Sequence, residues 1–187
     1  MNTKTIQAHS PNFDKRTPTA KINTIVIHHT ELPTVKAVYD IFENPERKVS
    51  SHYLIGRDGS LHQFVDEKKR AWHAGIRTWP GLDKLNDSSI GIELDNNGEE
   101  PFSKPLMDTL VTLCKELIKK YKIEERNIVG HSDIAYWRKI DPSHHFDWKA
   151  LATKNIGFFP KFSAKNSHIY RLNGSNLEVV ETKKKLA

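Results

Sequence analysis

The chain has 187 residues, a formal net charge of +6, 37% hydrophobic residues and 28% charged residues. This size and composition fit a soluble globular protein of one domain, with room for an appendage, and exclude a disordered chain. No apolar run approaches the roughly 18 residues that a membrane-spanning helix needs, which excludes an integral membrane protein. The single cysteine, Cys114, excludes a disulfide framework and a cysteine-rich zinc site, so any metal site must use the ten histidines and the carboxylates.

The positive charge by itself does not select a partner, because basic proteins are attracted to nucleic acid, to anionic membranes and to polyanionic cell-wall material. Much of the excess lies in Lys183–Lys185 and Lys119–Lys120, and such runs are typical of solvated faces. The sequence has neither zinc-finger spacing nor the aromatic and basic pattern of nucleic-acid binders. We therefore expect no nucleic-acid partner.

Residues 1–20 are polar and are interrupted by Pro11 and Pro18, which predicts an arm that either wraps around the domain or frays. The segment lacks the apolar core of a signal peptide. A cytoplasmic location is therefore expected, with a periplasmic or wall-associated location as the alternative.

The first predicted strand is the apolar run Ile25–Ile27, which continues into His28 and His29. A compact β-branched run bounded by a turn signal favours a buried central strand. Alternation along the strand sends the two histidines to opposite faces, so only one of them can easily join a shared site. A histidine at a strand end is often structural, but the ends of strands are also where α/β sheets bind ligands.

A helix is predicted over residues 35–43, and a hairpin over residues 51–55 and 61–65, which flank an Asp-Gly turn. His52 and His62 alternate with apolar neighbours in the hairpin. We interpret both as hydrogen-bonded sheet residues and not as metal ligands.

A long irregular stretch is predicted over residues 71–87, and a loop of this length inside a compact domain is often a binding loop. Its Trp72 and His73 could line a cleft; alternatively, the tryptophan anchors the loop to the core. The strand that follows, residues 89–94, carries Glu93 on the same side as Gly91. A glutamate in a buried strand is costly unless it has a partner or a task, so Glu93 is a candidate general base.

The clearest helix pattern covers residues 105–121, where leucines recur at three- and four-residue steps. A strand over residues 127–129 and a short helix over residues 147–153 follow. The alternation of strands and helices predicts an α/β fold with a mixed central sheet flanked by helices on both faces. A strand-like run at residues 177–180 leaves open whether the tail packs on the domain or begins a truncated second region.

The segment after the last strand combines His131, Lys139 and Asp141. Histidine nitrogen and carboxylate oxygen are ordinary zinc ligands, but a catalytic zinc needs three protein ligands and one open position. The ends of the strands that carry His28, Glu93 and His131 can converge on one edge of the sheet.

Five segments follow one another in a recognisable order, at residues 26–30, 51–59, 70–75, 86–93 and 130–142. Together they resemble the zinc-dependent N-acetylmuramoyl-L-alanine amidases, a family related to phage T7-type lysozyme and the peptidoglycan recognition proteins. The likeness covers about residues 22–150 and is strongest to the bacterial branch that trims 1,6-anhydro-muropeptides during wall recycling.

The resemblance implies a mixed central sheet flanked by helices, one Zn²⁺ per chain and a zinc amidase domain over residues 21–160, between an arm (1–20) and a C-terminal extension (161–187). It implies hydrolysis of the amide between the lactyl group of N-acetylmuramic acid, in its ordinary or 1,6-anhydro form, and L-alanine of the stem peptide. The implied residues are His28, His131 and Asp141 as zinc ligands, Glu93 and Lys139 as catalytic residues, and His29, Trp72, His73 and Lys84 as substrate contacts.

Peptidoglycan or its fragments are thus the expected partner, and a monomer is the expected state. Some relatives only bind peptidoglycan and typically lack part of the ligand set, whereas this sequence has all of it, which favours an enzyme. One departure concerns Tyr136 and Trp137, two bulky aromatics where the family commonly has small or turn-forming residues. We expect them to reshape the rim of the cleft and the choice of substrate.

Overall fold

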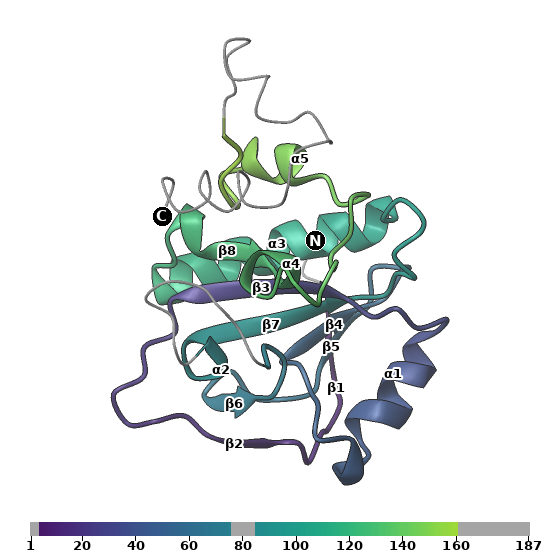
Figure 1. Ribbon diagram of the computed structural model, residues 1–187, viewed down its shortest axis with the longest axis vertical. Coiled ribbons are helices and arrows are strands. Elements are labelled where there is room, and N and C mark those ends of the chain that lie inside the picture. The colour runs from purple at the N-terminus through teal and green to yellow at the C-terminus, as the bar shows by residue number, and fades with distance from the viewer. Residues whose placement is uncertain (1–3, 76–84, 161–187) are drawn as a thin grey trace.

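A six-stranded sheet forms the centre of the protein in the computed structural model, which describes residues 4–75 and 85–160 (Figure 1). Four neighbouring strands in this sheet are parallel, and the next pair is antiparallel, so the sheet is mixed as predicted. In sheet order the strands are β1 (Thr5–Gln7), β5 (Leu61–Gln63), β4 (Tyr53–Ile55), β7 (Ser89–Leu94), β3 (Thr24–His29) and β8 (Ile128–Gly130).

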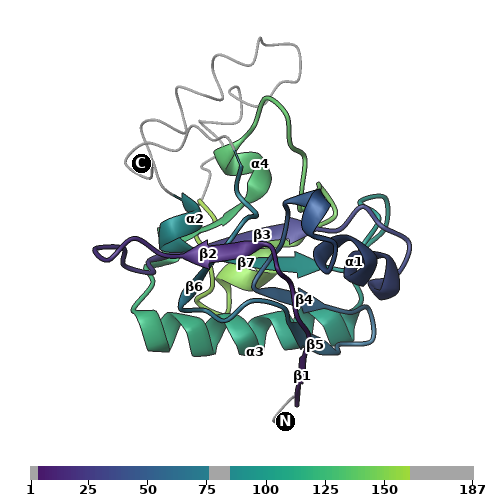
Figure 2. The same ribbon diagram turned by 90° about the horizontal axis from the view of Figure 1, so that it is seen from below.

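Helices cover both faces of the sheet, which confirms the predicted α/β class. Figure 2 shows α3 along one side of the strands and α2 and α4 on the other. The helices are α1 (Val35–Phe42), α2 (Leu85–Ser88), α3 (Lys104–Tyr121), α4 (His131–Ile134) and α5 (Trp148–Ala152). Two short 3-10 helices lie at Pro45–Arg47 and Glu125–Asn127.

Alternation along the two central strands divides the core into two layers. Ile25 and Ile27 belong to the large cluster that contains the leucines of α3, whereas Val26 belongs to a smaller cluster with Leu85 and Ile134. All six residues of β3 are buried. A strand that packs helices on both faces must be apolar on both, which explains its continuous Ile-Val-Ile run.

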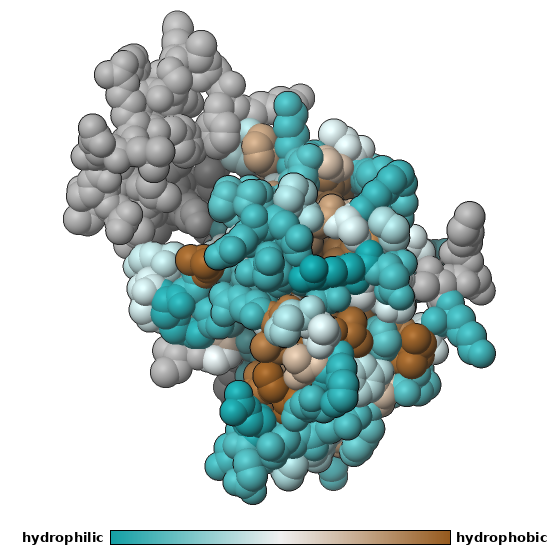
Figure 3. Space-filling view, turned by 90° about the vertical axis from the view of Figure 1, so that its right-hand side faces the viewer, coloured by the Kyte–Doolittle hydropathy of each residue, from teal (hydrophilic) through white to brown (hydrophobic). Residues whose placement is uncertain are grey.

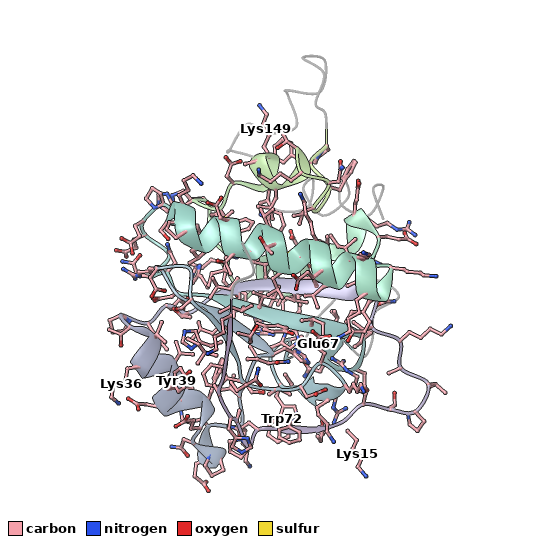
Figure 4. All side chains as sticks on the ribbon, turned by 180° about the vertical axis from the view of Figure 1, so that it is seen from behind. Lys15, Lys36, Tyr39, Glu67, Trp72 and Lys149 are labelled. Atoms are coloured by element: carbon pink, nitrogen blue, oxygen red, sulfur yellow. The ribbon has the colours of Figure 1, made fainter. Side chains whose placement is uncertain are left out.

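The end of α3 is tied to the sheet through the carboxylate of Glu67, which is labelled in Figure 4. This carboxylate accepts hydrogen bonds from the hydroxyls of Tyr53 and Tyr121 and, at 2.6 Å, from the ammonium of Lys120. Burial acts to raise the pKa of Glu67, but these hydrogen bonds outweigh it and lower the pKa. The carboxylate therefore stays ionised and cross-links helix and sheet.

The N-terminal arm lies along the body of the protein. In it, β1 pairs in parallel with β5, and β2 (Phe13–Lys15) pairs with β6 (Lys69–Ala71) in a separate antiparallel sheet. The three-residue strands β1, β2 and β6, and the short helices α2 and α4, were not predicted because segments so brief show no periodicity. The predicted run at residues 177–180 and the extension 161–187 lie outside the described residues.

Among the described residues, no helix is long and apolar enough to cross a membrane. Figure 3, seen from the side on which α1 lies, shows a mainly hydrophilic surface with small separate hydrophobic groups. The single cysteine, Cys114, lies on α3 and is buried in the large hydrophobic cluster.

Candidate metal centre and active site

The candidate site lies at one edge of the sheet, where β3, β7 and β8 end together. These strands are parallel neighbours, so their C-terminal ends meet at the same edge. The register pairs His28 with Glu93 across β3 and β7, and pairs Ile27 with Gly130, the residue before His131. The predicted convergence of the three strand ends is therefore present.

A short closed loop brings Asp141 back to His131. The helix α4 begins directly at His131, and the backbone amide of Ser132 donates to the carbonyl of Asp141 at 2.8 Å. Gly130 permits this return, because a Cβ at that position would lie 2.6 Å from Cδ of Pro142. Two side chains ten residues apart in sequence thus meet at one point.

Three potential ligand atoms form a tight triangle. The Nδ1 atoms of His28 and His131 are 3.0 Å apart, and they lie 3.0 and 3.1 Å, respectively, from Oδ2 of Asp141. All three residues are buried. Bonds of about 2.0–2.1 Å to a tetrahedral zinc place ligand atoms about 3.3 Å apart, close to these separations.

Hydrogen bonds alone do not satisfy this triangle. Each Nδ1 carries at most one proton and an ionised carboxylate carries none, so at most two protons serve three contacts. The other carboxylate oxygen of Asp141, Oδ1, is buried without a hydrogen-bond partner. A cation held by the three triangle atoms removes the need for protons between them, so the residues fit a zinc ion.

The electrostatics suit metal ligands as well. Burial lowers the pKa of His28 to about 4, although the hydrogen bond to Asp141 opposes the shift. Burial acts to raise the pKa of Asp141, but hydrogen bonds from His131 and His28 outweigh it and lower the pKa. At neutral pH the site therefore offers a neutral imidazole and a carboxylate, which are the forms that bind metal.

Glu93 adds a carboxyl group beside this triangle. Its Oε2 is buried and has no hydrogen-bond partner. Burial raises the pKa of Glu93 well above its usual value, and the negative charge of Asp141 raises it further, while the positive charge of Lys139 opposes the rise. A buried carboxyl with a raised pKa is a typical general base or acid.

Residues 18–144 match the N-acetylmuramoyl-L-alanine amidase family, which is more than half of the chain. The chain belongs to this family. The predicted family is thus confirmed, and with it the prediction of an amidase; the complete His-His-Asp set argues against the alternative of a module that only binds peptidoglycan.

Named relatives agree with the assignment. The amidase is 39% identical over 161 residues to the 1,6-anhydro-N-acetylmuramyl-L-alanine amidase AmpD of Haemophilus influenzae, which covers 76% of this chain and 88% of AmpD. It is 36% identical to the N-acetylmuramoyl-L-alanine amidase AmiD of Escherichia coli, over 80% of this chain and 59% of AmiD.

Solved structures show the same fold. A crystal structure of a Se-Met AmpD derivative matches 82% of this chain and 96% of its own with a TM-score of 0.72 at 30% identity. The complex of AmiD from E. coli with anhydro-N-acetylmuramic acid-L-Ala-D-gamma-Glu-L-Lys matches 86% of this chain and 68% of its own with a TM-score of 0.70 at 34% identity.

The residues expected to contact substrate lie in different places in the amidase. His29 leaves the opposite face of β3 from His28. Its ring packs at Gly98, where a Cβ would come within 2.9 Å, and its two nitrogens are buried without hydrogen-bond partners. Lys84 lies outside the described residues.

Trp72 and His73 point in different directions. Trp72 is half-buried beside β2 (Figure 4). The pKa of Asp14, on β2, is lowered mainly by a hydrogen bond from Arg70 and further by one from the side chain of Trp72. His73 is buried behind His28, with its Nδ1 3.0 Å from Nε2 of His28.

Sequence reasoning missed two contributors to the site. The first is Arg138, which places one guanidinium nitrogen 3.1 Å from the carbonyl oxygen of Ala74 and 3.4 Å from Nε2 of His131. The second is Ser89, whose hydroxyl lies 3.1 Å from Nε2 of His73. Gly91 was the available signal for the second contact, because a glycine inside a strand often marks a close approach by another group.

Proposed function

We propose that this amidase uses one zinc ion, held by His28, His131 and Asp141, to hydrolyse the amide between the lactyl group of N-acetylmuramic acid and L-alanine of the stem peptide. The names of AmpD and the ligand bound to AmiD support the 1,6-anhydro form as a substrate. The convergence of three ligand atoms within 3.1 Å of one another is the observation that carries the proposal.

His28, His131 and Asp141 would hold the zinc ion, which when bound would lower the pKa of water toward about 7 and polarise a carbonyl oxygen. Glu93 accepts the proton of the attacking water and returns it to the nitrogen of the leaving L-alanine. Its position beside His28 on the neighbouring strand and its unpartnered Oε2 support this role.

Lys139 supplies a positive charge to the negative oxygen that develops on the former carbonyl. The side chain is half-buried, and its charge acts on the pKa values of both Glu93 and His28, which supports a position within the same site. A donor of this kind contributes on the order of 3 kcal/mol to transition-state stabilisation.

Of the predicted substrate contacts, His29, Trp72 and Lys84 remain part of the proposal. Lys84 is suited to meet a carboxylate of the stem peptide. The ring nitrogens of His29 make no hydrogen bond, and Nε2 lies 3.5 Å from Oε1 of Glu31, so the ring can offer a hydrogen bond to a polar group of the substrate. The cytoplasmic location and the monomeric state stay predictions.

Mass spectrometry of digests tests the function. The zinc-loaded protein is incubated separately with an anhydro-muropeptide and with intact peptidoglycan. We expect release of the free stem peptide and of the sugar with its lactyl carboxylate, most rapidly from the anhydro-muropeptide. Binding of both substrates without any cleavage by the zinc-loaded protein would contradict the proposal and support a binding module.

A further inference from the structure

We propose that His73 is a positioning residue that fixes the proton and the orientation of His28, so that Nδ1 of His28 is presented as a metal ligand. This inference rests on the proposed zinc site. It assigns His73 a role inside the protein, in place of the substrate contact expected from the sequence.

The two rings meet on the side of His28 that faces away from the ligand triangle. Nδ1 of His28 lies near His131 and Asp141, while Nε2 of His28 is 3.0 Å from Nδ1 of His73. The rings are nearly perpendicular, with an interplanar angle of 87°. A hydrogen bond at Nε2 therefore leaves Nδ1 directed at the metal position.

A backbone carbonyl at the far end of this chain determines the direction of every hydrogen bond in it. The Ser89 hydroxyl contacts the carbonyl oxygen of Leu85, which can only accept, so the hydroxyl donates to it. The hydroxyl oxygen then accepts from Nε2 of His73, 3.1 Å away.

The same reasoning continues to the metal ligand. With its proton on Nε2, neutral His73 has a lone pair on Nδ1, which accepts the Nε2 proton of His28. The lone pair of His28 is left on Nδ1, where a metal ion needs it. Three consecutive hydrogen bonds thus select one tautomer of His28.

The fold holds His73 in place from several sides. Its ring lies against β7 at Gly91, where a Cβ would come within 2.5–2.8 Å of three ring atoms. The side-chain oxygen of Asn86 accepts from the backbone amides of His73 and Ala74 at 3.3 and 2.8 Å. A fixed position of this kind is what an orienting residue requires.

Two substitutions of similar size separate the hydrogen bond from the packing. His73→Leu removes the acceptor, whereas His73→Asn keeps an oxygen near the place of Nδ1. Zinc affinity is measured by competition with a chromophoric chelator. We expect a loss of about 10- to 100-fold for His73→Leu, and a loss of less than about threefold for His73→Asn.

The cobalt-substituted protein provides a readout that does not depend on turnover, because its visible spectrum reports the geometry of the ligands. We expect an altered spectrum for His73→Leu and a spectrum close to the unmodified one for His73→Asn. Thermal unfolding of the metal-free proteins checks that both variants fold. Ser89→Ala, which removes the acceptor of His73, serves as a milder second variant with an expected loss in the same direction.

Unchanged zinc affinity in a folded His73→Leu protein would overturn the inference, and so would equal losses in the two His73 variants, since these indicate packing alone. If His73→Leu does not fold, unchanged zinc affinity in Ser89→Ala overturns it. Failure of the unmodified protein to bind zinc would instead overturn the proposed function, on which the inference rests.

Discussion

Two clusters of polar side chains, one around the half-buried Arg16 and one around the buried His28, differ in how their hydrogen bonds are completed. Around Arg16, all three guanidinium nitrogens reach backbone carbonyl oxygens, at 2.6–3.0 Å, belonging to Glu67, Asn86, Asp87 and Ser89. At the edge of the sheet, the triangle of His28, His131 and Asp141 has fewer protons than contacts, and Oδ1 of Asp141 has no partner.

This difference distinguishes a polar cluster that stabilises the fold from one that is suited to bind a cation. Protein groups alone complete the hydrogen bonds of Arg16, which joins the N-terminal arm to Glu67 and to residues 86–89. The triangle of His28, His131 and Asp141 is short of protons, and this supports the proposed metal centre. Buried polar groups are normally satisfied, so the specific unsatisfied ones indicate where a ligand or a proton transfer belongs.

The largest effect is expected from Asp141→Ala. Removal of the only carboxylate in the triangle leaves two imidazoles, so bound zinc should fall from one per chain to nearly none, and hydrolysis should fall with it. Metal analysis after dialysis measures the content. Asp108→Ala, which changes an exposed carboxylate on α3, should leave both quantities unchanged. A zinc-replete, active Asp141→Ala protein would remove Asp141 from the ligand set.

Glu93→Gln should separate chemistry from metal binding. The amide cannot accept the proton of water, so we expect kcat to fall about 10²- to 10⁴-fold while zinc content stays at one per chain. Steady-state hydrolysis of an anhydro-muropeptide measures the rate. Glu99→Gln is the matched control, because Glu99 is exposed. Full activity in Glu93→Gln would refute the assignment of the base.

Arg16→Met should lower the stability of the fold, whereas Glu93→Gln should lower the rate of hydrolysis. Loss of the guanidinium leaves several carbonyl groups without their donor, so we expect the free energy of unfolding to fall by about 2–4 kcal/mol. Zinc affinity of the folded protein should change by less than about threefold. Urea denaturation and chelator competition measure the two quantities, with the exposed neighbour substitution Lys15→Met as the control. A large loss of zinc affinity at unchanged stability would erase the distinction between the clusters.

The smallest effect is expected from the double substitution Tyr136→Ala and Trp137→Ala. These side chains are 53% and 47% exposed, so the free energy of unfolding should change by less than about 0.5 kcal/mol. They lie between His131 and Asp141 in the sequence, and we expect KM to rise about threefold to tenfold through lost contacts with the sugar or peptide. An unchanged KM for both anhydro-muropeptide and intact wall would rule out the predicted role in substrate choice.

The long elements of the fold could be predicted because each shows its own periodicity. The leucine repeat marked α3, and the Ile-Val-Ile run marked β3 as a buried central strand. The arm could not be placed, since Arg16 finds its acceptors 51–73 residues further along the chain. Nothing in a local pattern indicates such a distant pairing.

The candidate site was predictable in its members more than in its arrangement. Family resemblance named His28, His131 and Asp141, and parallel strand ends explained how the first two could meet. The position of His73 depends on the missing side chain of Gly91 and on the hydroxyl of Ser89, which are tertiary contacts. The sequence therefore suggested that His73 lines the cleft, whereas the fold places it behind His28.

Titration of the metal-free protein with zinc, followed by hydrolysis of an anhydro-muropeptide, tests the proposed zinc dependence most directly. Activity should be absent after complete removal of metal, rise linearly with added zinc, and reach its plateau at one zinc per chain. Full hydrolysis by the rigorously metal-free protein, or a plateau without any bound zinc, would contradict the assignment of the metal centre.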